Sequence, residues 1–340
     1  MQNPLANTPS PTDITEDRSS RFASLKRWIE RHPYLSALLF LVYWLALLLI
    51  LGRFFLFILM ITHLSLHLSL LQANLLGEVL LVLIVVLPIF LLGWWSRVGL
   101  TRGINGQGVV ICLIPLLLLV GLPLLGIVEV TSQASESILV SAIALSLLTG
   151  FAEEGMFRGL ILRALLPAGI WPAVLISALC FTAVHLTNLI NGISFGYVAG
   201  QLLLAFGSGV LFAAIRLRTN SLWPGLLLHA GHDVGGLILL GVDPAIIRAP
   251  LTSAAIIVNG VFSLLFLLNA WVLLRASQVQ RLKVIYGLAP APVPSNPYHL
   301  DNPHPPYPSY PPSTPYQEYT SSPIYGNQQP PQVPPDDEWR

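Results

Sequence analysis

Apolar residues gather into eight long runs along the chain, and most polar residues lie between them. A helix needs about 20 residues to cross a bilayer, and each run is close to that length or longer. Backbone N–H and C=O groups in lipid must bond within their own segment, so such runs form helices. The pattern predicts an all-α polytopic membrane protein with about eight transmembrane helices, over Leu35–Ile61, Leu75–Trp95, Val109–Val128, Ile138–Leu166, Trp171–Ile190, Phe195–Ile215, Leu222–Leu240 and Ala254–Leu274.

Composition agrees with this fold class. Charged residues make up 10% of the 340 residues, against about 25% in soluble domains. The net charge of +1 gives no electrostatic basis for binding nucleic acid. The two cysteines lie within apolar runs, so neither a disulfide framework nor a cysteine zinc site is expected. The first apolar run is too long for a cleavable signal peptide.

The basic residues predict an orientation. If the eight runs cross the membrane in turn, 15 of the 17 Lys and Arg residues fall on the side of the N-terminus. Only Arg53 and Arg248 fall on the other side. Because Lys and Arg accumulate in cytoplasmic loops, the chain is expected in the cell membrane with both termini in the cytoplasm.

The chain divides into five parts by composition. A polar and basic cytoplasmic segment, 1–34, precedes the first transmembrane helices at 35–137. A core with charged residues follows at 138–240, then the last transmembrane helix and its basic flank at 241–289. The tail, 290–340, holds 16 of the 28 prolines and six of the ten tyrosines. Such a tail is expected to be disordered, and its Pro-x-x-Pro spacings would suit a Pro-motif-binding partner.

The core contains polar residues deep within apolar runs, where a charge costs about 2.5–3.5 kcal/mol and is functional by default. Their estimated depths agree to about 10 Å at 1.5 Å per residue, so they can meet inside the bilayer. Three clusters stand out: Glu153 and Glu154 with Arg158 in the fourth run, Phe181 with His185 in the fifth, and His229 with Asp233 in the seventh.

Spacing assigns different environments to the two glutamates. Glu154 and Arg158 are four apart, on one helix face, and are expected to form a structural ion pair. Glu153 points about 100° away and has no cation nearby in sequence, which suits a general base. His229 and Asp233 are also four apart and share a face. Glu78, near the start of its run, is expected at the membrane interface.

Together the three clusters resemble three motifs of a known family. Glu153-Glu154-x-x-x-Arg158, Phe181-x-x-x-His185 and His229-x-x-x-Asp233 are similar, in order and separation, to those of the CPBP intramembrane glutamic endopeptidases. That family includes the type II CAAX prenyl proteases and the Abi proteins. The resemblance covers roughly residues 138–240, about a third of the chain.

The resemblance implies an endopeptidase that hydrolyses a peptide bond without a metal or other cofactor. Glu153 and His185 would activate water, and His229 with Asp233 would help to stabilise the oxyanion. Glu154, Arg158 and Phe181 would support the site. The implied partners are the bilayer and a peptide or protein substrate in or at the membrane, CAAX-like or otherwise membrane-associated.

The residues also favour activated water by elimination. The sequence has no Gly-x-Ser-x-Gly and no His-Glu-x-x-His, and its cysteines lack polar neighbours that would create a thiolate. Asp233 does not fit a simple oxyanion-stabilising role, because an ionised carboxylate repels a nearby oxyanion. It is expected either to carry a proton or to orient His229.

Three alternatives come from other classes. Glu153, His185, His229 and Asp233 are a plausible zinc set, which would make the chain a zinc-dependent membrane protease. A non-enzymatic membrane adaptor or immunity protein would keep the same cluster for helix packing. A transporter is a third, although the sequence shows no clear inverted repeat.

Overall fold

The computed structural model describes residues 22–61, 70–126, 128–243 and 252–290. These ranges are mostly helical and contain no strand. The first 21 residues of the predicted N-terminal segment lie outside the described residues. The tail from residue 291 also lies outside the described residues, and with it the Pro-x-x-Pro spacings on which the expected Pro-motif-binding partner depends.

A helix over residues 22–31 comes first among the described residues. The named elements after it are α2 (Pro33–Ile61), α3 (Leu70–Leu92), α4 (Trp95–Val98), α5 (Gly106–Leu116), η2 (Leu117–Gly121), α6 (Leu122–Gly126), α7 (Val128–Thr131), α8 (Glu136–Glu154), η3 (Gly155–Ile161), α9 (Leu162–Leu165), η4 (Leu166–Ala168), α10 (Ile170–Val184), α11 (Thr187–Ile190), α12 (Phe195–Thr219), α13 (Trp223–Val242), α14 (Ser253–Leu273) and α15 (Ala276–Ile285).

Eight helical stretches in the described residues are long and apolar enough to cross a membrane, one for each predicted run. The prediction of an all-α, multi-pass membrane protein is confirmed. The longest stretch, Glu136–Ala168, has 33 residues because α8 continues without a break through η3, α9 and η4.

Capping residues explain where several of these helices begin. The third stretch starts at Gly106 rather than at the predicted Val109, because the Asn105 side chain accepts a hydrogen bond from the Gly108 N–H. Ser135, Ser194 and Thr252 cap α8, α12 and α14 in the same way. A polar cap bonds an N–H group that has no partner within the helix, so a helix extends to its cap even where the apolar run starts later.

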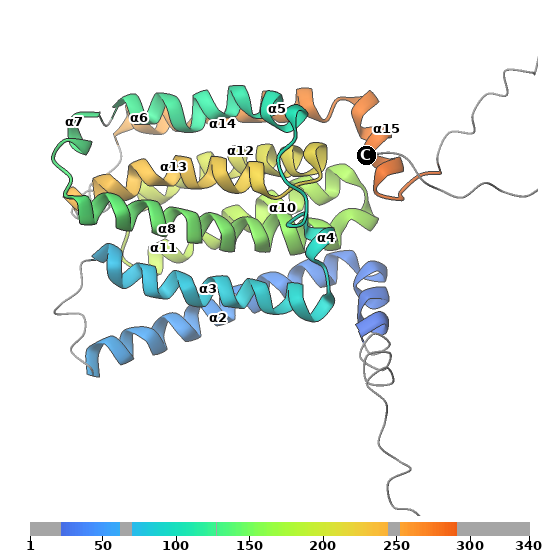
Figure 1. Ribbon diagram of the computed structural model, residues 1–340, viewed down its shortest axis with the longest axis horizontal. Helices are drawn as coiled ribbons and strands as arrows, with labels where there is room; N and C mark the ends of the chain where they lie inside the picture. The colour runs from blue at the N-terminus through green and yellow to red at the C-terminus, as the bar shows by residue number, and fades with distance from the viewer. Residues whose placement is uncertain (1–21, 62–69, 127, 244–251, 291–340) are drawn as a thin grey trace, which may run out of the picture. The chain divides into compact units, whose positions relative to one another are not determined.

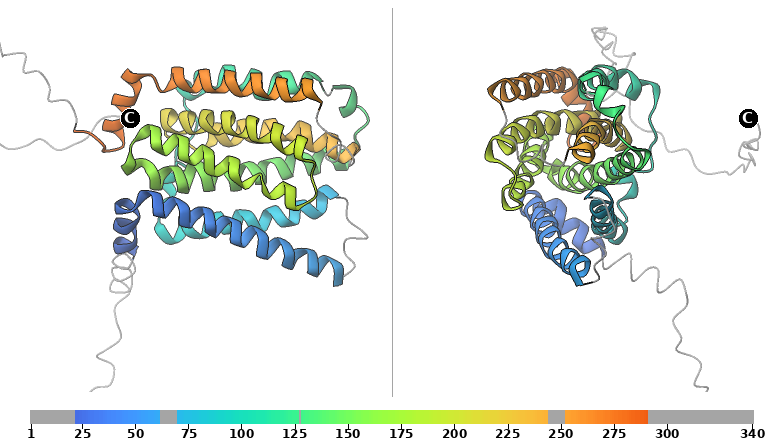
Figure 2. Two further views of the ribbon diagram at one scale, coloured as in Figure 1. Left: turned by 180° about the vertical axis from the view of Figure 1, so that it is seen from behind. Right: turned by 90° about the vertical axis from the view of Figure 1, so that its left-hand side faces the viewer.

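Four helices make up the centre of the bundle: α8, α10, α12 and α13 (Figure 1). Helix α8 packs against α13 and α3, while α12 packs against α10 and α14. Figures 1 and 2 show α2 and α3 on one side of this centre, with α14 and the α5–α6 segment on the other. Helix α8 therefore has protein neighbours on two sides, and polar residues near its end are shielded from lipid.

Small residues set how closely the central helices approach. A Cβ atom at Gly150 would lie 3.1 Å from the Leu226 carbonyl oxygen, where α8 crosses α13. A Cβ atom at Gly207 would lie 2.5 Å from the Ser263 Oγ, where α12 crosses α14. Glycine lets membrane helices come this close. The α8–α13 contact is the one that brings the glutamate pair of α8 to His229.

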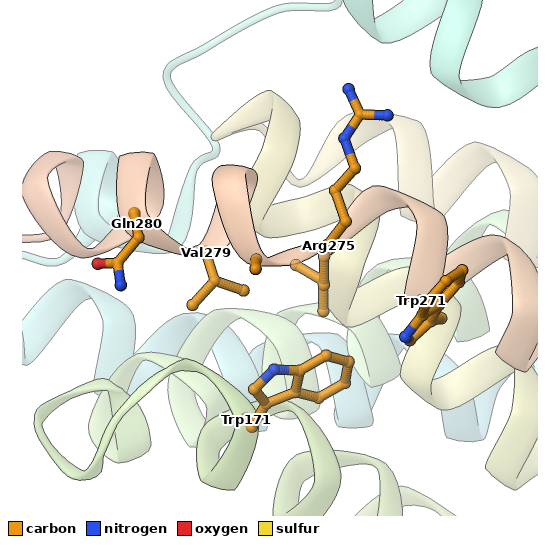
Figure 3. A pocket seen from close by; sticks show the side chains of 7 residues that line it. Trp171, Trp271, Arg275, Val279 and Gln280 are labelled. Carbon is orange, nitrogen blue, oxygen red and sulfur yellow. The ribbon is translucent and has the colours of Figure 1, made fainter.

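A hollow of about 410 Å³ lies between α10, α14 and α15 (Figure 3). Trp171 and Trp271 line it, together with Arg275. Trp171 stands at the beginning of one span and Trp271 near the end of another, where tryptophans gather at a membrane–water interface. None of the lining residues is a predicted site residue, so the hollow is separate from the polar cluster described next.

Candidate functional site

The two glutamates stand at a change of helix type. Glu153 and Glu154 are the last residues of α8, and the π-helical turn η3 follows directly and carries Arg158. Single π-helical turns within α-helices are rare and occur often at functional sites. Glu154 and Arg158 are each 1% exposed, and Arg158 Nη1 lies 2.9 Å from Glu154 Oε1. The expected ion pair is therefore formed, and it is fully enclosed.

His229 on α13 contacts both glutamates of α8 and also Asp233. Its Nδ1 lies 3.0 Å from Glu154 Oε1. Its Nε2 lies 3.3 Å from Asp233 Oδ2 and 3.5 Å from Glu153 Oε2. An ionised carboxylate only accepts hydrogen bonds, so we assign the Nδ1 proton of His229 as donated to Glu154. The Nε2 side of the ring then faces the two remaining carboxylates.

Exposure separates the carboxylates into two kinds. The Glu153 side chain is 19% exposed and that of Asp233 is 27% exposed, whereas that of Glu154 is 1% exposed. Glu154 is also confined from α13, because a Cβ atom at Gly225 would lie 3.3 Å from its Oε2. Glu153 and Asp233 are thus the carboxylates that can meet a water molecule or a substrate. Glu154 holds its neighbours in place.

Phe181 on α10 contacts three of the predicted site residues through one ring. The Arg158 guanidinium carbon lies 4.1 Å from the ring centre, a cation–π arrangement. The rings of His185 and His229 meet it edge-on, at centroid distances of 4.9 and 5.7 Å. This geometry supports the expected role of Phe181 in holding the site together.

His185 stands beside the cluster. It follows the last residue of α10, and its ring packs against Phe181, one helical turn earlier. The same Phe181 ring also contacts His229, so both imidazoles pack against one aromatic side chain. In the part of the chain that the structure describes, no hydrogen bond or ion pair joins His185 to Glu153 or Asp233. The structure therefore brings Glu153, His229 and Asp233 into contact and leaves His185 at their edge.

Two residues of this neighbourhood were not expected from the sequence. Phe212 on α12 stacks on His229 at a centroid distance of 5.6 Å and lies 5.4 Å from the Arg158 guanidinium carbon. A phenylalanine within an apolar run carries no signal that would single it out. Glu78 on α3 is the second, since its carboxyl group lies near Glu153 and Asp233. A lone carboxyl group within an apolar run is the signal that could have pointed to it.

A cluster with these side chains can perform acid–base chemistry. The partly exposed carboxylate of Glu153 lies beside the imidazole of His229. Asp233 and the buried Glu154–Arg158 ion pair hold that imidazole in place. Among the described residues, no group of three or more His, Cys, Asp or Glu side chains is arranged to hold a metal ion. Measuring the metal content of active protein would test the zinc alternative.

In a comparison with known protein families, residues 135–235 match the family model described as type II CAAX prenyl endopeptidase, Rce1-like. The matched region contains all seven predicted site residues and confirms the resemblance inferred from their motifs. No curated protein and no solved structure matches the chain.

Proposed function

We propose that this chain, whose residues 135–235 match the Rce1-like model of type II CAAX prenyl endopeptidases, is a membrane protease that uses a water molecule activated by Glu153 and His185. The observation that carries the proposal is the contact of Glu153 with His229, 3.5 Å between Oε2 and Nε2, beside the closed Glu154–Arg158 pair. This contact brings Glu153, a partly exposed base, next to the Nε2–H group of His229, which can donate a hydrogen bond to the substrate.

Hydrolysis would proceed in two steps at this cluster. The water oxygen attacks the carbonyl carbon of the substrate while Glu153, assisted by His185, takes up a water proton. The carbonyl oxygen gains negative charge, which the Nε2–H of His229 stabilises. Glu153 then gives the proton to the leaving nitrogen as the C–N bond breaks. Glu154 and Arg158 keep their charges and their mutual ion pair during both reaction steps.

The proposed substrate is a peptide in or at the membrane, with a CAAX-like prenylated C-terminus as the candidate taken from the family. The distribution of the basic residues supports, as part of this proposal, a position in the cell membrane with both termini in the cytoplasm. A non-enzymatic adaptor would bind such a peptide and leave it intact.

A cleavage assay tests the function. The full chain in nanodiscs is expected to cut a farnesylated CAAX peptide, with one product series found by mass spectrometry. The same protein with Glu153→Gln serves as the control for contaminating proteases. The unprenylated peptide separates recognition of the lipid from recognition of the sequence. Binding without cleavage by the wild type would favour the adaptor, and cleavage that stops when zinc is removed would favour the zinc enzyme.

The Asp233 side chain gives a sharper test of the mechanism. Its Oδ2 lies 3.3 Å from His229 Nε2, which supports a role in orienting the imidazole. Asp233→Asn is expected to keep much of the activity, because an amide oxygen accepts the same hydrogen bond. Asp233→Ala leaves His229 unrestrained and is expected to lose about 10²–10³-fold, as when an oxyanion donor is removed. The measurement is the rate of peptide cleavage by the three proteins. An inactive but folded Asp233→Asn protein would show that the negative charge itself is needed.

A further inference from the structure

Glu78 lies on α3, the helix that packs against the glutamate-bearing face of α8. Its carboxyl group is hydrogen-bonded to the side chain of Thr149, which stands one turn before Glu153 on α8. If this carboxyl group were ionised, Glu153 and Asp233 would repel its charge and His229 would attract it. A third helix therefore brings a fourth carboxyl group to the site.

One oxygen of Glu78 is left without a partner. The Oε2 atom is buried, and no described residue forms a hydrogen bond with it. A buried, ionised carboxylate without a cation is costly, because the interior offers no water to replace its lost hydration. A carboxyl group that carries a proton at Oε2 avoids that cost.

The charges around the site give the same result. Glu154 is paired with Arg158 at 2.9 Å and with His229 at 3.0 Å. Asp233 and Glu153 both face the other nitrogen of His229. The two cations of the cluster, Arg158 and a charged His229, are thus already shared among three carboxylates. Glu78 has no ion-pair partner among the described residues, so it is the carboxyl group of this cluster on which a proton costs least.

Charged and titratable groups on the neighbouring helices do not alter this assignment. Helix α8 presents Glu153 to Glu78, and α13 presents His229 and Asp233. On α2, the Tyr43 hydroxyl group donates to the Ile84 carbonyl oxygen of α3. On η3, Arg158 is committed to Glu154, and on α4, Arg97 is paired with Glu30.

We propose that Glu78 is a positioning residue of the site, which holds a proton on Oε2 so that Glu153 stays ionised and serves as the base. This inference rests on the proposed function. Without the proton on Glu78, two adjacent carboxylates with no further cation would oppose the negative charge that develops on the substrate. Activity then falls at alkaline pH, when Glu78 loses its proton.

Glu78→Gln tests the proposal, because glutamine has nearly the same shape and cannot ionise. The variant should keep activity at neutral pH and lose the alkaline fall of the wild-type pH profile. Thr149→Val keeps the carboxyl group but removes a hydrogen bond that favours its ionised form, so the alkaline fall should move to higher pH. Glu136→Gln, an exposed change at the start of the same α8, is the matched control and should leave the profile unchanged.

Infrared spectroscopy tests the proton without any substrate. The wild-type protein in nanodiscs should show the C=O stretch of a buried, protonated carboxyl group at neutral pH, and Glu78→Gln should lose it. If the spectrum of the variant keeps the whole band, or its pH profile keeps the alkaline fall, the proposal is wrong. Wild type and Glu153→Gln that release no peptide would instead overturn the proposed function, and the infrared band would still show whether Glu78 holds the proton.

Discussion

Glu153→Gln is expected to lower the rate of peptide hydrolysis by about 10²–10⁴-fold, the usual contribution of a general base. Glutamine fills the same space and can still accept a hydrogen bond from His229, whose Nε2 lies 3.5 Å from the Glu153 carboxylate. The thermal unfolding temperature should therefore stay close to that of the wild type. The measurement is cleavage of one peptide by purified proteins in nanodiscs, with unfolding followed in the same preparation.

Glu154→Gln is the matched control, one residue further along the same helix. It should reduce stability more than Glu153→Gln does, because Arg158 and His229 both lose an ionised partner that is 1% exposed. Activity per folded molecule should fall less than in Glu153→Gln. Equal losses of activity with normal folding in both variants would contradict the separation of a reactive glutamate from a supporting one.

The fold could be predicted from the sequence because a bilayer restricts the choices. A run of about 20 apolar residues has to form a helix, so eight runs gave eight helices. The helix ends were harder to predict, since they depend on single caps. Asn105 extends its helix to Gly106, outside the apolar run.

The candidate site could be predicted only in part. Contacts within a helix follow from spacing, and the pairs Glu154–Arg158 and His229–Asp233 were found in this way. Contacts between helices depend on rotation and depth, which the sequence fixes only to about 10 Å here. The hydrogen bond of His229 with Glu154 and the proximity of Glu78 to Glu153 are contacts between helices, so they could not be predicted.

Phe212 shows a further limit of the sequence. Its ring stacks on His229, yet its apolar neighbours in α12 give it the same pattern as any core residue. Only the packing of α12 beside α10 and α13 shows that this phenylalanine covers the site.

Arg158→Ala is expected to cause the largest loss of stability, about 3–5 kcal/mol, the usual cost of leaving one member of a buried ion pair alone. The Arg158 side chain is fully enclosed and lies 2.9 Å from Glu154, and its guanidinium nitrogens form no hydrogen bond with any described residue. Its charge is held by the ion pair and by the face of the Phe181 ring, 4.1 Å away. The variant leaves Glu154 buried with only His229 as a partner.

The free energy of unfolding in mixed detergent measures this loss, and Arg97→Ala supplies the control. Arg97 Nη1 lies 2.7 Å from Glu30 Oε1, but both side chains are more than 40% exposed, so that change should cost under about 1 kcal/mol. The double variant Arg158→Met with Glu154→Gln removes both charges and should recover part of the lost stability. If Arg158→Ala is no more destabilising than Arg97→Ala, the pair does not support the site. If the double variant loses the sum of the losses measured for Arg158→Met alone and Glu154→Gln alone, Arg158 stabilises the fold through Phe181 rather than through Glu154.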